Sequence, residues 1–416
     1  MFGIVIAAIK FIILLGFLVL IHEGGHFLVA KLCKVRVHEF AIGFGPYIWK
    51  KKKGDTLYAL RAVPLGGFVR MEGEEERSDQ QDSFSQKSIP QRIAILLAGG
   101  TVNIIFGLVV YFILATAGGN YVSNQIEQGT EEASLQAGDK IIAIDHKKIH
   151  LKSDLEEALK NSNGNSVEVQ IERNGQKETV KVTPKQQQTK NTGIYFGATG
   201  DHLNTEIRGV YPNSPASAAG LKEKDVILKV NGQEVHDDPY AVIDLTQNTT
   251  AENVQYTIHR NGQEMEISVK PETVVKYYLG VSLKKADNTL GNNLYYGFWD
   301  TANFSVSILD NLKTLLTGHV SVDQLMGPIG ISTMVADTNG FAEFIYVLAL
   351  ISLALGVTNL LPIPPLDGWK VVVYLVEAIR RKPMREEVQM QIESWGFIFM
   401  IVLSLYVAYH DVLRIF

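Results

Sequence analysis

The sequence has a single cysteine, Cys33, among its 416 residues. An intrachain disulfide and a zinc site built from cysteines are therefore excluded. The chain also lacks a basic patch with interleaved aromatic residues, and its formal net charge is −5, so we expect no nucleic-acid partner. No basic stretch precedes the first apolar run and no small-residue cleavage site follows it, which argues against a cleaved signal peptide.

Apolar residues are concentrated in four blocks, which predict four membrane-spanning helices. The blocks cover residues 2–21, 93–117, 341–361 and 395–409. Basic residues gather after the first and third blocks, at Lys31, Lys34, Arg36, 50–53, 380–382 and Arg385. The positive-inside rule places these basic clusters in the cytoplasm, so the first and third helices lead inward and the other two lead outward.

The middle of the chain, residues 120–271, is polar, rich in predicted strands and internally repeated. Residues 135–145 match 221–231, and residues 169–176 match 256–263, at an offset of 86 to 87 residues. The constant offset predicts two copies of one small domain. An Asn-Gly pair lies between alternating strands in each copy, which is a strong hairpin signal.

These patterns predict a polytopic α-helical membrane protein with an inserted pair of extracytoplasmic α+β domains. The expected domains are residues 1–119, 120–195, 196–275 and 276–416, the first and last forming the membrane core. Residues 295–316 are spaced as an amphipathic helix, either on the outer membrane face or against a protein core.

Residues 57–71 alternate and are β-rich around Pro64-Leu65-Gly66-Gly67. This predicts a hairpin with its turn at these four residues. The hairpin either dips toward the membrane, with its backbone satisfied by protein or water, or lies on the cytoplasmic surface.

The first apolar block ends in a His-Glu-x-x-His motif, at His22, Glu23 and His26. On a helix the two histidines project from one face and can bind one Zn²⁺, and Glu23 can take a proton from metal-bound water. The alternative is a polar helix end just outside the membrane. The unbroken apolar run before His22 argues against it, because ionisable groups there are costly.

A second candidate ligand, Asp367, follows three prolines at the end of the third apolar block. Prolines break a helix, so we expect Asp367 on irregular backbone at membrane depth. Its alternative role is to cap a helix that starts near Lys370. The topology places Asp367 and both histidines toward the cytoplasmic side, and two histidines with one aspartate leave the open position of a catalytic zinc site.

At this point the chain resembles the bacterial site-2 proteases of the RseP/RasP type. The motifs that carry the resemblance are, in chain order, His22-Glu23-x-x-His26, Gly43-Phe44-Gly45-Pro46, Pro64-Leu65-Gly66-Gly67-Phe68, Gln91-Arg92-Ile93-Ala94, Ala98-Gly99, Met326-Gly327-Pro328-Ile329 and Asn359-x-x-Pro362-x-Pro364-x-x-Asp367-Gly368. The second repeat, with Ser214-Pro215-Ala216, also resembles a PDZ domain, and the first is a weaker match.

The resemblance implies an intramembrane endopeptidase of the bacterial cytoplasmic membrane with one Zn²⁺ per chain. Its zinc ligands would be His22, His26 and Asp367, and Glu23 would be the general base. Its substrates would be single-span membrane proteins already cut outside, such as anti-sigma factors or signal-peptide remnants. The substrate strand would be held by Leu65, Gly66, Gly67, Phe68, Asn359 and Pro364. The PDZ pair would bind peptide segments and reject substrates with bulky outer domains.

Two rival functions stay open at this stage. A metal-ion transporter would also place histidine and aspartate in membrane spans, but it needs neither Glu23 nor peptide-binding domains. A scaffold that holds membrane peptides with weak or no catalysis would keep every domain. Three departures from the family pattern, Gly24, Gly100 and Trp369, bear on this choice. Trp369, beside Asp367, is the main support for the scaffold.

Overall fold

The computed structural model describes residues 2–74, 76, 78–130, 134–196, 204–211, 214–317, 327–336, 338, 340–382 and 384–415. The chain forms two compact units, one of residues 1–115 with 304–416 and one of residues 116–303. Four helices in the described part of the chain are long and apolar enough to cross a membrane: Ile6–Leu32, Ile89–Gly118, Phe341–Asn359 and Glu387–Leu413. Each contains most of one predicted apolar block. Met326 of the quoted motifs lies outside the described residues.

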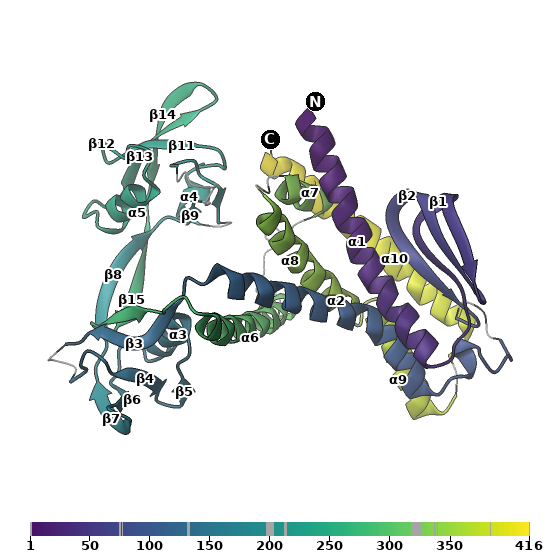
Figure 1. Ribbon diagram of the computed structural model, residues 1–416. Helices are drawn as coiled ribbons and strands as arrows, with labels where there is room; N and C mark the ends of the chain where they lie inside the picture. The colour runs from purple at the N-terminus through teal and green to yellow at the C-terminus, as the bar shows by residue number, and fades with distance from the viewer. Residues whose placement is uncertain are drawn as a thin grey trace. The chain divides into compact units, whose positions relative to one another are not determined.

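The first unit is mostly helical (Figure 1). Its helices are α1 (Phe2–Leu32), α2 (Ile89–Gly118), the C-terminal part of α6 (Leu290–Leu316), α7 (Pro328–Ala336), α8 (Phe341–Asn359), α9 (Asp367–Arg380) and α10 (Glu386–Ile415), with a short 3-10 helix η1 (Phe84–Gln86). Glycines allow the long helices to approach closely. A Cβ on Gly25 would lie 2.6 Å from the Ala98 carbonyl oxygen, and one on Gly356 would lie 2.6 Å from the Gly100 carbonyl oxygen. α2 therefore packs tightly against both α1 and α8.

The short helix α7 is held at both ends by charged side chains from other helices. Asp411 of α10 accepts hydrogen bonds from the backbone N–H groups of Gly327 and Gly330, at 3.3 and 2.8 Å. Lys10 of α1, the one charge inside the first apolar block, donates to the carbonyl and hydroxyl oxygens of Thr338, at 2.8 and 3.2 Å. A carboxylate at the N-terminus and an ammonium just past the C-terminus both complement the helix dipole.

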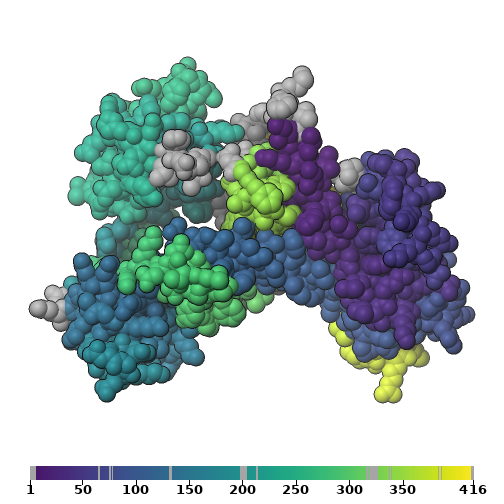
Figure 2. Space-filling view, viewed as in Figure 1, coloured from purple at the N-terminus to yellow at the C-terminus, as the bar shows by residue number. Residues whose placement is uncertain are grey.

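A β-sheet of two long bent strands, β1 (Val37–Lys53) and β2 (Thr56–Met71), packs along α1. Figure 2 shows α1 and this sheet as one continuous surface. Residues 39–42 of β1 have two sets of partners, 57–60 on one side and 67–70 on the other. Among the described residues, 67–71 pair only with β1, so they form a free edge of the sheet.

The prediction of a hairpin turn at Pro64-Leu65-Gly66-Gly67 is therefore wrong. The antiparallel reversal lies between Lys53 and Thr56, and residues 64–67 belong to β2. Residues 57–60 and 67–70 cannot pair with each other because residues 39–42 lie between them. Gly43 and Gly45, with φ of 84° and 83°, provide the sharp bend in β1 that this arrangement requires.

The second unit contains two β-rich lobes with the same local pattern. The first lobe has β3 (Val122–Gln128), β4 (Lys140–Ile144), β5 (Lys147–Lys148), α3 (Lys152–Asn161), β6 (Val167–Arg173), β7 (Gln176–Val182) and β16 (Ser282–Lys285). Its sheet has the order β16-β3-β4-β6-β7, with β5 paired to β4. The second lobe has β9 (Ile194–Tyr195), β10 (Gly209–Val210), α4 (Pro215–Ala218), β11 (Val226–Val230), β12 (Gln233–Glu234), α5 (Pro239–Gln247), β13 (Val254–Arg260) and β14 (Gln263–Val269).

The second lobe is inserted within the first. An antiparallel ribbon of β8 (Lys185–Asn191) and β15 (Glu272–Tyr278) leads to it and returns from it (Figure 1). The returning chain completes the first lobe, since β16 pairs with β3 and Leu279 is buried in that lobe's core. The domain boundaries given above stay a prediction.

One ion pair is repeated in both lobes at the positions that the sequence repeat aligns. Arg173 donates two hydrogen bonds to Asp139, at 2.8 and 2.7 Å, and Arg260 donates two to Asp225, at 2.6 and 2.7 Å. Both carboxylates are buried, and the bonds from Arg173 lower the pKa of Asp139. The predicted Asn-Gly turns are confirmed as well, because each of these residues has positive φ, as a type I′ hairpin turn requires.

Candidate metal centre

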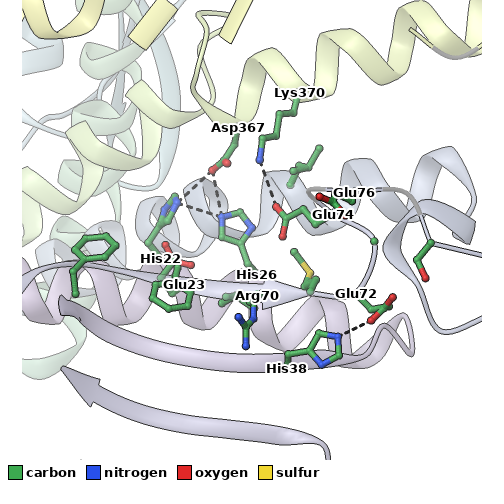
Figure 3. Close-up of a pocket in the computed structure, with 17 residues that line it drawn as sticks. His22, Glu23, His26, His38, Arg70, Glu72, Glu74, Glu76, Asp367 and Lys370 are labelled. Atoms are coloured by element: carbon green, nitrogen blue, oxygen red, sulfur yellow. Dashed lines mark hydrogen bonds and ion pairs between the residues drawn. The ribbon is translucent and has the colours of Figure 1, made fainter. Parts of the chain in front are cut away.

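Three side chains from two helices converge at one point (Figure 3). His22 and His26 lie one turn apart on α1, and their Nε2 atoms are 3.2 Å apart. Each Nε2 atom lies 3.3 Å from Oδ2 of Asp367. Ligand atoms bound to a tetrahedral Zn²⁺ at about 2.0–2.1 Å lie roughly 3.3 Å from one another. The three atoms thus match one triangular face of a zinc coordination tetrahedron, and the donor set of two imidazoles and one carboxylate suits this metal.

Asp367 is the first residue of α9. The expectation that it lies on irregular backbone and the alternative that it caps the helix are therefore both wrong. The cap residue is Leu366, and the helix begins three residues earlier than predicted. Asp367 reaches the histidines because the chain folds back sharply after α8: a Cβ on Gly368 would lie 2.3 Å from the Leu360 carbonyl oxygen. Burial raises the pKa of Asp367, but the imidazoles of His22 and His26 lower it by a larger amount. The pKa of Asp367 therefore lies well below its usual range. Its buried Oδ2 has no ordinary hydrogen-bond partner among the described residues, which leaves this oxygen available to a metal.

Helix α2 packs directly behind the two histidines. The Nδ1 atom of His26 lies 2.8 Å from the carbonyl oxygen of Ile95. A Cβ on Gly99 would lie 2.3 Å from His26 Nε2 and 2.8 Å from His22 Cε1. Asn103, which is fully buried, approaches His22 Nδ1 with its Nδ2 at 3.4 Å.

Asn103 is not among the site residues predicted from the sequence, so its position beside a candidate ligand is a finding of the structure. The available signal was its spacing, since Asn103 lies one turn after Gly99 in an apolar helix where a polar side chain needs a partner. The role of the Ile95 carbonyl could not be predicted, because a backbone group carries no sequence signal.

Glu23 faces the free edge of the β-sheet. A Cβ on Gly67 would lie 2.7 Å from Val19 Cγ1 and 3.4 Å from Glu23 Cγ, so only glycine fits between β2 and α1. A cavity of about 1010 Å³ opens here and contains the metal-centre residues. Its lining includes His22, Glu23, His26, Phe44, Phe68, Val69, Arg70, Met71, Leu96 and Asp367 (Figure 3).

The other candidate substrate-binding residues differ in position. Phe68 lines the cavity, and Gly66 and Gly67 lie on the strand leading to it. Leu65 is also in β2, but its side chain is outside the described part of the structure. Asn359 ends α8, with its Nδ2 3.5 Å from His22 Nδ1. Pro364 packs instead against α10, where a Cβ on Gly396 would lie 2.4 Å from Pro364. Pro364 is not among the described residues that line the cavity.

Charged pairs border the cavity beyond the metal centre. Lys370 lies 3.4 Å from Glu74, and His38 lies 2.6 Å from Glu72. Burial lowers the pKa of Lys370, but Glu74 and Asp367 raise it, and the net shift is upward. No local sequence pattern predicts these pairs, because their members are far apart in the chain.

Comparisons with known proteins place the whole chain in one family. The model of peptidase family M50 matches residues 10–403. The regulator of sigma E protease of Haemophilus influenzae is 31% identical, over 98% of each chain. The regulator of sigma-W protease RasP of Bacillus subtilis is also 31% identical over 98% of each chain, and the zinc metalloprotease RasP of Geobacillus kaustophilus is 30% identical over 98% of each.

Among solved structures, the HtrA3 PDZ domain bound to a phage-derived ligand matches 22% of this chain and 92% of its own, with 22% identity. The TM-score of 0.19 is too low to support an argument about the fold. The family match covers nearly the whole chain and confirms the expectation of a site-2-type protease. The chain, a bacterial membrane protein, therefore belongs to peptidase family M50.

Proposed function

We propose that this protein is a zinc-dependent intramembrane endopeptidase that cleaves single-span membrane proteins. The observation that carries the proposal is the triangle of His22 Nε2, His26 Nε2 and Asp367 Oδ2, with sides of 3.2 to 3.3 Å, in one cavity with Glu23 and a free strand edge. A metal-ion transporter would need the three ligands, but it would have no use for Glu23 or for the strand edge.

In this proposal His22, His26 and Asp367 hold one Zn²⁺, which when bound would supply a Lewis acid that activates water and polarises the scissile carbonyl. Glu23 accepts a proton from the attacking water and delivers it to the nitrogen of the leaving amine. Because Gly67 has no side chain, β2 can pack closely against α1 beside Glu23. A peptide bound at the strand edge is therefore held near the general base.

A helical substrate must unwind before hydrolysis, because its amides are engaged in their own hydrogen bonds. Residues 67–71, which among the described residues pair only with β1, offer the backbone groups of their other edge to such an unwound segment, in the manner of strand addition to a sheet. Phe68 and Met71 line the cavity next to that edge and would contact apolar side chains of the substrate. Asn359, at the end of α8, would donate to the substrate backbone near the metal.

We assign the two lobes of residues 116–303 as PDZ-type domains outside the cytoplasm, and the metal centre to the cytoplasmic side of the membrane. The relatives named as regulators of sigma factors support anti-sigma factors as substrates, cut after a first extracytoplasmic cleavage. The lobes would bind peptide segments and exclude substrates with intact outer domains. A peptide-holding scaffold without catalysis is the weaker proposal, because Asp367, although it is next to Trp369, still lies with its Oδ2 3.3 Å from each histidine Nε2.

The test compares two variants of the purified protein in detergent. Glu23→Gln keeps the size of the side chain but removes the base, so zinc stays bound while cleavage falls at least about a hundredfold. Asp367→Ala removes a ligand, so zinc content falls together with activity. Metal content is measured by elemental analysis, and cleavage is followed on a labelled single-span peptide. Normal cleavage by Glu23→Gln would refute the mechanism.

A further inference from the structure

Helix α2 presents three consecutive turns of one face to the metal-ligating histidines. Ile95, Gly99 and Asn103 are spaced by four residues, so they lie along one stripe. The Ile95 carbonyl meets Nδ1 of His26 at 2.8 Å, the Cα of Gly99 lies beneath both rings, and Asn103 meets Nδ1 of His22 at 3.4 Å. Each ring thus has its metal-facing Nε2 on one side and a group of α2 at its other nitrogen.

A histidine that binds a metal through Nε2 carries its proton on Nδ1, where it needs a hydrogen-bond acceptor. The Ile95 carbonyl can only accept, so it selects this tautomer for His26. Asn103 places Nδ2 toward His22, while its buried Oδ1 has no hydrogen-bond partner among the described residues. Rotation of the amide by half a turn exchanges the two atoms and brings the acceptor to His22.

We propose that Asn103 is a positioning residue for the zinc site, and that its Oδ1 accepts a hydrogen bond from Nδ1–H of His22 when the metal is bound. The inference rests on the proposed function, because it requires zinc at His22. It gives α2 the task of orienting both imidazoles, one through a backbone carbonyl and one through a side chain.

The backbone of Asn103 is fixed independently of its amide. The hydroxyl of Ser352 on α8 donates to the Asn103 carbonyl oxygen at 2.9 Å, and both residues are fully buried. Asn359 also approaches His22 Nδ1, at 3.5 Å, but it is only half-buried. With Asn103 accepting from His22, Asn359 is left to bind the substrate.

The experiment uses the full-length protein in detergent with four variants. Asn103→Leu removes both amide functions, Asn103→Asp keeps only acceptors, and Asn103→Ala replaces the leucine variant if that one does not fold. Ser352→Ala is the control, because it removes the α2–α8 hydrogen bond at the same residue without changing the amide. Zinc affinity is measured by chelator competition, the ligand field by the absorption spectrum of the Co²⁺-loaded protein, and folding by the Tm of the metal-free protein.

We expect Asn103→Leu to bind zinc about ten- to a hundredfold more weakly and to alter the Co²⁺ spectrum. Asn103→Asp should keep the parental affinity or exceed it, and Ser352→Ala should keep it. The inference is overturned if Asn103→Leu keeps the parental affinity, or if Asn103→Asp or Ser352→Ala loses as much as Asn103→Leu. A parent protein that binds no zinc would refute the proposed function and this inference together.

Discussion

The glycine of α2 that lies beneath the two histidines gives the sharpest test of the metal centre. In Gly99→Ala the new methyl group would lie 2.3 Å from His26 Nε2 and 2.8 Å from His22 Cε1. Ordinary contact distances between such atoms are about 3.5 Å, so the rings must move by roughly 1 Å. The ligand triangle, whose sides are 3.2 to 3.3 Å, cannot be kept after a shift of that size. We expect zinc affinity to fall at least about a hundredfold, or about 2.8 kcal/mol.

The matched control is Gly24→Ala, in the His-Glu-x-x-His motif itself. A Cβ on Gly24 would meet no atom of the described residues within 4 Å, apart from its chain neighbours, so the metal centre is left undisturbed. Because alanine is the better helix former, we expect unchanged zinc affinity and about 0.5–1 kcal/mol of added stability. Both variants are compared by chelator competition and by thermal unfolding of the metal-free protein. Parental zinc affinity in Gly99→Ala would show that the described packing of α2 against the histidines is incorrect.

Three further predictions concern the neighbouring helix, the topology and the inserted lobe. Trp369→Gly should bind zinc as the parent does and cleave a labelled peptide at least as fast; a large loss of zinc would show that the indole supports the ligands. In intact cells, an impermeant thiol reagent should label a cysteine at the exposed position of Ser217, as Ser217→Cys in a Cys33→Ser background, but not native Cys33. The opposite preference would refute the proposed orientation. Removal of residues 192–271, with the β8–β15 ribbon closed by a short turn, should preserve cleavage of short substrates and permit cleavage of substrates with folded outer domains. Complete inactivity of a stably inserted deletion protein would instead mean that the second lobe is needed for catalysis.

The parts of the site that were predictable from sequence are those governed by local periodicity. His22 and His26 lie on one face if the first apolar run is helical, and the structure confirms that it is. The proline-rich segment before Asp367 indicated a break in the chain, although the exact start of α9 depended on how closely Gly368 packs under the carbonyl groups that end α8. The aspartate and the arginine of the two lobes align in the sequence repeat. Their pairing is a tertiary contact, which the repeat alone does not predict.

The sheet next to α1 shows why the rest was not predictable. The segment Pro64-Leu65-Gly66-Gly67 has the composition of a turn, and local reasoning placed one there. The structure keeps it within strand β2, because residues 39–42 pair with strands on both sides and because a glycine at position 67 is needed for contact with α1. Both causes are long-range contacts, and the same is true of Asn103, whose role depends on a histidine 81 positions away.

The insertion of the second lobe between β8 and β15 has an evolutionary consequence. Its two ends are adjacent, because Asn191 and Glu272 are partners across the ribbon. A domain with adjacent ends can be acquired, lost or replaced as a cassette without interrupting the buried core of its host. The host lobe is completed only after the chain returns, through Leu279 and β16. Selection can therefore change the surface of the second lobe, or exchange that lobe entirely, while the first lobe and the membrane unit are inherited unchanged.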